Sequence, residues 1–127
     1  MGRRVIRAPL LARPLDPWPE ALTHAFEKLM QDPEVYLTMN GPSDFHVTGV
    51  LKDWDITGRL GAIRVPTLIL SGRYDEVTPD VVETVNRGIP GSEWVLFENS
   101  SHMAHLEEPL HYLQDVEHFL SRVEGRV

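Results

Sequence analysis

The sequence predicts an α/β protein built on a parallel sheet. Residues 65–71 form an apolar run without a charged side chain, and unbroken runs of this kind are typical of strands buried on both faces of a parallel sheet. A second short apolar run at 94–97 follows a helical stretch. Strand, helix and strand in this order indicate a parallel pair joined by a crossover helix.

The first part of the chain predicts helices. Arginines and prolines are dense in residues 1–17, which indicates an irregular arm. A helix is expected from Pro19, because proline suits the first helical position and apolar residues then recur at three- and four-residue spacing. Asp32 is expected to cap a second short helix. That helix should end at Gly41, since glycine accepts the left-handed conformation that stops a helix.

The loop at 42–58 separates these helices from the expected sheet, and Phe45 and Val47 suit a short extended piece within it. A helical turn around Leu60 and Ile63 leads to the strand at 65–71, and Pro66 is tolerable as its first residue.

Two further helices complete the pattern. One should begin at Pro79 with Thr78 as its cap. One long amphipathic helix is expected over 106–123. The inward-facing residues expected on the first of these are Val81, Val82, Val85 and Ile89.

Composition excludes several classes of function. The 127 residues include no cysteine, which excludes disulfides and thiol catalysis and fits a cytoplasmic protein. The net charge of −7 argues against nucleic-acid binding, which needs a basic face. No apolar run reaches the length of about 18 residues that a membrane helix needs, and the apolar stretch near the N-terminus is too broken for a signal peptide.

Asp75 and His102 are the residues that point to chemistry. Each follows the end of an expected strand, where α/β sheets place their active sites. In α/β-hydrolases the triad residues follow the order nucleophile, acid, histidine, so this arrangement indicates the C-terminal end of that fold. A G-x-S-x-G nucleophile motif does not occur; residues 41–45 approach it but lack the last glycine.

Four blocks of sequence resemble the proline iminopeptidases of the α/β-hydrolase fold. They are MNGPSDF at 39–45, GVLKDWD at 49–55, the run PTLILSGRYDEVTP at 66–79, and SHM at 101–103. The resemblance implies the C-terminal portion of such an enzyme. Residues 1–58 would be part of a helical cap, and 59–127 the last two parallel strands and flanking helices of the core.

The resemblance further implies a serine hydrolase that releases N-terminal proline, or another N-terminal residue, from a peptide or amino-acid derivative with a free N-terminus. Neither cofactor nor metal is expected. His102 would be the general base, with His105 as its rival, and Asp75 the group that orients it, with Glu76 as competitor. The alternative for Asp75 is an aspartate that forms a turn and caps the next helix.

Three further residues belong to the implied substrate site. Asp44 stands where the family has a glutamate that holds the substrate ammonium, and its alternative is a plain turn residue. Phe45 and Trp54 would wall the proline pocket, or simply pack between cap and core.

Other functions stay open at this point. An amino-acid amidase or esterase of the same fold is one alternative, and a non-catalytic remnant or interaction subunit is another. Two strands do not make a stable sheet alone. We therefore expect the 65–71 strand to pair either with a missing N-terminal half or with a second copy of the chain.

Overall fold

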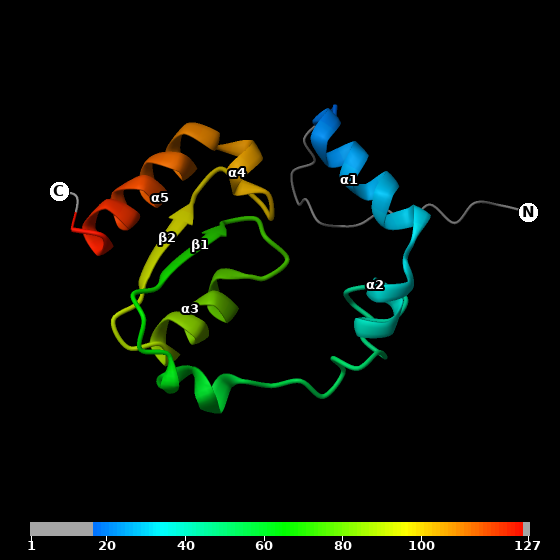
Figure 1. Cartoon of the computed structure of the whole chain (residues 1–127), viewed down its shortest axis with the longest axis horizontal. Helices are drawn as coiled ribbons and strands as arrows, with labels where there is room; N and C mark the ends of the chain where they lie inside the picture. Colours follow the sequence, from blue (N-terminus) through cyan, green and yellow to red (C-terminus); the bar gives the residue numbers. More distant parts are fainter. Residues whose placement is uncertain (1–16, 126–127) are drawn as a thin grey trace, which may run out of the picture. The chain divides into compact units, whose positions relative to one another are not determined.

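The computed structural model describes residues 17–125, and the arm expected over the first residues therefore lies almost wholly outside the described part. Its elements, in chain order, are α1 (Glu20–Gln31), α2 (Glu34–Met39), the 3-10 helix η1 (Thr57–Ala62), β1 (Leu68–Gly72), α3 (Pro79–Gly88), β2 (Glu93–Phe97), α4 (Ala104–Glu107) and α5 (Pro109–Val123) (Figure 1).

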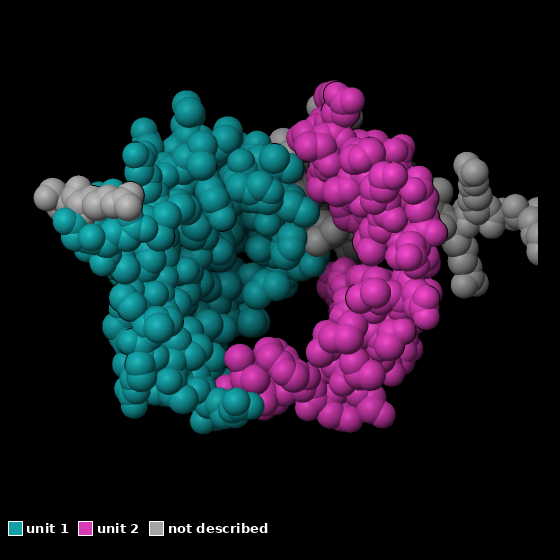
Figure 2. Space-filling view, in the orientation of Figure 1, with its two compact units in different colours: residues 1–15, 57–127 teal, residues 16–56 magenta. Residues whose placement is uncertain are grey.

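The described chain forms two compact units, coloured separately in Figure 2. The helical unit, residues 17–56, contains α1 and α2. The sheet unit, residues 57–125, contains the remaining elements. No helix in the described ranges is long and apolar enough to cross a membrane.

β1 and β2 pair in parallel, as the sequence predicts, and form a two-stranded sheet. Helix α3 covers one face of this sheet and α5 lies on the other (Figure 1). The indole Nε1 of Trp94 donates a hydrogen bond of 2.9 Å to Ser71 Oγ across the two strands. Phe97, at the end of β2, is fully buried and packs against His111 of α5, with their ring centroids 4.8 Å apart.

The strand at 65–71 differs from expectation in two ways. It begins at Leu68, because Pro66 has no N–H to give to a ladder; the first pairing contact is from Glu93 N to the Thr67 carbonyl. Its apolar residues are only half-buried, because β2 is the one strand beside it in the described chain. The edge of β1 away from β2 is unpaired in this sheet.

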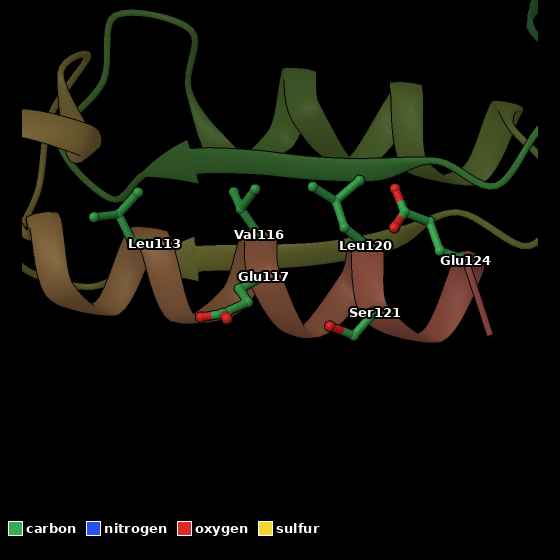
Figure 3. Close-up of a pocket in the computed structure, with 6 residues that line it drawn as sticks. All are labelled: Leu113, Val116, Glu117, Leu120, Ser121 and Glu124. Carbon is green, nitrogen blue, oxygen red and sulfur yellow. The ribbon is translucent and has the colours of Figure 1, made fainter. Parts of the chain in front are cut away.

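The apolar face of α5 is likewise only partly covered. Leu113, Val116 and Leu120 point from this helix toward the strands, whereas Glu117 and Ser121 point away (Figure 3). These residues, with Glu124, line an open groove along the helix. Leu113 is nevertheless 62% exposed, so the apolar face of α5 is wider than the two strands that it meets.

Four other expectations about the helices and loops are wrong. Asp32 does not cap α2; it ends α1, and its N–H donates to Lys28 O. Val81 is 53% exposed rather than inward-facing. The expected extended piece around Phe45 and Val47 is reduced to an isolated bridge between residues 43 and 46. The single long helix is broken at Glu108, because a proline at 109 cannot donate to the preceding turn and begins α5 instead.

Candidate active site

Asp75 and His102 meet at the carboxyl end of the parallel pair. Asp75 lies in the loop after β1 and His102 in the loop after β2. The Nδ1 atom of His102 is 3.0 Å from Asp75 Oδ1. Because the carboxyl ends of parallel strands lie at one edge of the sheet, residues 27 positions apart in sequence become neighbours.

The carboxylate of Asp75 is held from two directions. Its Oδ1 also accepts the backbone N–H of Val77 at 3.0 Å, and its side chain is 9% exposed, against 37% for His102. A carboxylate at Nδ1 favours the tautomer that carries its proton on that nitrogen. The Nε2 atom is then the acceptor, as a general base requires.

Gly72 allows the two loops to approach each other. A Cβ at this position would lie 2.0 Å from the carbonyl oxygen of Ser101 and 2.5 Å from that of Ser100. Beside it, the N–H of Tyr74 donates to Ser100 O at 3.0 Å, and that of Arg73 to Phe97 O at 2.9 Å. The glycine at the end of β1 therefore lets the histidine loop lie directly on the aspartate loop.

An ion pair joins the same two loops on the surface. Arg73 donates to both carboxylate oxygens of Glu98, at 2.8 Å and 2.6 Å. This hydrogen bonding lowers the pKa of Glu98 below its ordinary value of 4.5 and raises that of Arg73. A second pair, between Arg122 and Glu93 at 2.6 Å, links the end of α5 to the start of β2.

Glu107 and Glu108 contact the loop that precedes His102, and the sequence pattern did not predict this. The backbone N–H and the hydroxyl of Ser101 both donate to the Glu107 carboxylate, each at 2.8 Å. Ser100 Oγ donates to Glu108 at 2.5 Å. The available signal was the pair of adjacent carboxylates only a few residues after two serines and a histidine.

The two competing residues take different places. His105 lies on α4, with its ring edge-on to Tyr112 and the centroids 5.8 Å apart. Glu76 remains close to the pair: one ligand-type atom each from Asp75, Glu76 and His102 lies within 4.8 Å of the others, a spacing that also fits a metal ion. Asp75 Oδ1 already faces two nitrogen atoms, which favours an acid–base pair at this position.

The three substrate-site candidates all lie in the helical unit. Asp44 Oδ1 accepts hydrogen bonds from the hydroxyl of Tyr36 at 2.9 Å and from Asn40 Nδ2 at 3.0 Å. Phe45 and Trp54 are both 64% exposed. Asp44 is therefore a fixed carboxylate, whereas the two aromatic side chains are largely open to solvent.

The curated relatives of the chain are proline iminopeptidases. No family model matches the chain. A curated proline iminopeptidase of Saccharolobus solfataricus is 46% identical over 105 residues, which are 83% of this chain and 34% of that protein. The chain is a homologue of the C-terminal portion of the proline iminopeptidases.

Solved structures support the same relationship. A proline iminopeptidase of Mycobacterium smegmatis matches with a TM-score of 0.81 at 34% identity, over 87% of this chain and 37% of that one. An esterase of Exiguobacterium antarcticum matches with a TM-score of 0.60 at 29% identity, over 84% and 37%. The fold is thus part of an α/β-hydrolase, and the chain spans about a third of the length of the curated relatives that it matches.

Proposed function

We propose that the chain supplies the acid and the base of a serine hydrolase that releases N-terminal proline from peptides. The observation that supports this most strongly is the 3.0 Å contact between His102 Nδ1 and Asp75 Oδ1 at the carboxyl end of the sheet. Proline iminopeptidase relatives at 34–46% identity support a hydrolase of this family.

The proposed chemistry is acyl transfer. His102 Nε2 takes the proton of a serine hydroxyl as that oxygen attacks the acyl carbonyl, and returns it to the leaving amine as the peptide bond breaks. The ring then takes a proton from a water molecule that attacks the resulting ester, and proline is released as the serine regains its proton. Asp75 holds the ring in the required tautomer and stabilises the imidazolium that forms. The serine and the oxyanion donors are proposed to come from the N-terminal portion of such an enzyme.

Asp44 is the proposed anchor for the substrate ammonium. Its Oδ1 is held by Tyr36 and Asn40, which fixes the direction of the carboxylate before any substrate arrives. A carboxylate placed in advance loses little conformational entropy on binding a cation. Phe45 and Trp54 are proposed to contact the proline ring, because pockets for small apolar groups are lined by aromatic side chains.

The partner proposed for the sheet unit is the N-terminal portion of a proline iminopeptidase chain. An unpaired strand edge accepts another strand, and β1 has such an edge in the sheet that residues 17–125 form. The exposed apolar face of α5, shown in Figure 3, would cover the added strand. Self-association through the same edge is the competing outcome.

Reconstitution tests the proposal. The chain is mixed with the N-terminal portion of the Saccharolobus solfataricus relative, and hydrolysis of a proline arylamide is measured. The chain alone should be inactive, because catalysis without the nucleophile is weak, and the mixture should be active. The mixture with His102→Ala is the control.

Two results would contradict parts of this proposal. Turnover by the chain alone that a serine-directed fluorophosphonate blocks would show that the chain contains its own nucleophile. Sedimentation of the chain alone as a well-folded monomer at micromolar concentration would show that the β1 edge needs no partner.

An amidase or esterase is the second candidate, favoured by the match to a solved esterase at 29% identity. The reconstituted enzyme would then prefer amino-acid amides or simple esters to proline peptides. A folded but inactive complex would favour the non-catalytic interpretation.

The proposed location of the chain is cytoplasmic.

A further inference from the structure

The loop that presents His102 contains two buried hydroxyl groups. Ser100 and Ser101 are both fully buried, although each has a polar side chain that must find a partner once it leaves water. Both partners come from residues 107 and 108, at the end of α4.

The two glutamates divide the loop between them. Glu107 receives the N–H and the hydroxyl of Ser101, one on each carboxylate oxygen. Glu108 receives the hydroxyl of Ser100 and, at 3.3 Å, the N–H of Asn99, both on Oε2. Three consecutive residues before His102 are thereby fixed by charge-assisted hydrogen bonds, which are stronger than neutral ones.

The other side of the loop is fixed by the backbone. Tyr74 N donates to Ser100 O, and the loop lies against Gly72 with no room for a side chain. The peptide units just before His102 are thus held between the aspartate loop and the two glutamates. The residue that carries the imidazole, His102, follows these peptide units directly.

We propose that Glu107 and Glu108 are positioning residues that aim His102 at Asp75. This role rests on the proposed function, in which Asp75 and His102 are the catalytic pair. It adds the residues that set the geometry of Asp75 and His102. Glu107 is the cleaner of the two to test, since Glu108 also lies 3.7 Å from His111.

The chemistry of Glu107 offers a conservative variant. In Glu107→Gln the amide oxygen still accepts the N–H of Ser101, and the amide nitrogen donates to the hydroxyl, which turns round to accept. Glu107→Ala removes both contacts and leaves two buried donors unsatisfied, which is the more costly change. A role in positioning therefore predicts rescue by glutamine and failure with alanine.

The experiment follows the Nδ1 proton of His102 by NMR in the full chain. A proton held between His102 and Asp75 should give a low-field signal that exchanges slowly with water. Exchange should be faster by about tenfold or more in Glu107→Ala and close to wild type in Glu107→Gln. Glu27→Ala, an exposed site on α1, is the matched control and should change nothing.

The possible outcomes distinguish a failure of the positioning role from a failure of the proposed catalytic function. Glu107→Ala could lower the melting temperature and leave the exchange of the Nδ1 proton unchanged below that temperature. This result would show that Glu107 is purely structural and would overturn its role as a positioning residue. If Glu107→Ala does not fold, Ser101→Ala removes only the hydroxyl contact, and it should still accelerate exchange; unchanged exchange would refute the proposal. A signal insensitive to Asp75→Asn would refute the catalytic pair itself.

Discussion

The sheet unit and the helical unit hold their polar side chains in different ways. In the sheet unit the contacts join distant parts of the chain: Asp75 to His102, 27 residues apart, and Arg73 to Glu98, 25 apart. In the helical unit Asp44 is held by residues only four and eight positions away. One site therefore depends on strand pairing, and the other on a local turn.

Burial differs in the same direction. Among the described residues of the helical unit, Leu22 is the one buried hydrophobic side chain, whereas the sheet unit contains the others. A unit with so little buried apolar surface gains little stability of its own. Changes in the sheet unit should therefore affect folding and chemistry together, whereas changes at Asp44 should affect recognition alone.

The largest effect should come from the catalytic pair. In the reconstituted enzyme, His102→Ala should lower kcat by about 10⁴-fold or more, because the base is lost. Asp75→Asn should lower it by about 10⁴-fold through the wrong tautomer. Steady-state kinetics with His105→Ala as control measure this. A greater loss from His105→Ala than from His102→Ala would place the base on α4 instead.

Gly72→Ala should produce the next effect, this time on stability. The added methyl group would meet two backbone oxygens of the histidine loop, and overpacking of this kind costs about 1–3 kcal/mol. Urea unfolding of the chain measures the change. Gly58→Ala is the matched control, because a Cβ there meets nothing within 4 Å; equal losses in the two variants would show that the loops do not need this close approach.

Asp44→Asn should change recognition without changing folding. Its Oδ1 still accepts from Tyr36 and Asn40, but the charge that binds an ammonium is gone. In the reconstituted enzyme kcat/KM for free-amine proline substrates should fall about tenfold to a hundredfold. Activity on an N-acetylated substrate should hardly change, and Asp44→Glu should keep the free-amine activity. Equal losses on both substrates would identify Asp44 as a turn residue.

The smallest effect concerns the exposed pair of Arg73 and Glu98. The pKa of Glu98 is depressed in the folded chain by the hydrogen bonds from Arg73, so the pair stabilises the fold above the ordinary pKa of 4.5. That contribution is lost as the pH falls through the lower, folded value. Wild type should melt slightly higher than Glu98→Gln at pH 7, and the difference should vanish in acid. A difference that grows in acid would reverse the assigned sign.

The sheet was the part of the fold that the sequence predicted best. Two apolar runs, each followed by a polar loop, predict both the parallel strand pair and the closeness of Asp75 to His102. Glu107 and Glu108 were not foreseen, because their contacts depend on how α4 turns back on the loop. The sequence did not predict the interruption of the last helix at Glu108. The apolar spacing continues through this position, although Pro109 follows it.

Exposure was the property hardest to predict. Leu113 has the spacing of a core residue, and periodicity shows that a face is apolar without showing what covers it. In the described chain the sheet ends at β1, so the side chain stays open. Residues that are core-like in pattern and exposed in the structure thus mark the surface where a partner is proposed.

The bond between Trp94 and Ser71 gives the two strands an optical signature. The indole N–H of Trp94 is hydrogen-bonded within the sheet, and such an indole emits at a different wavelength from one in water. Trp54, in the helical unit, is largely exposed. With Trp18 and Trp54 both replaced by phenylalanine, Trp94 is the one remaining tryptophan. Separation of β1 from β2 would then change the environment of Trp94 and shift its emission wavelength. Strand pairing, and the catalytic geometry that depends on it, can then be followed in real time while a partner binds.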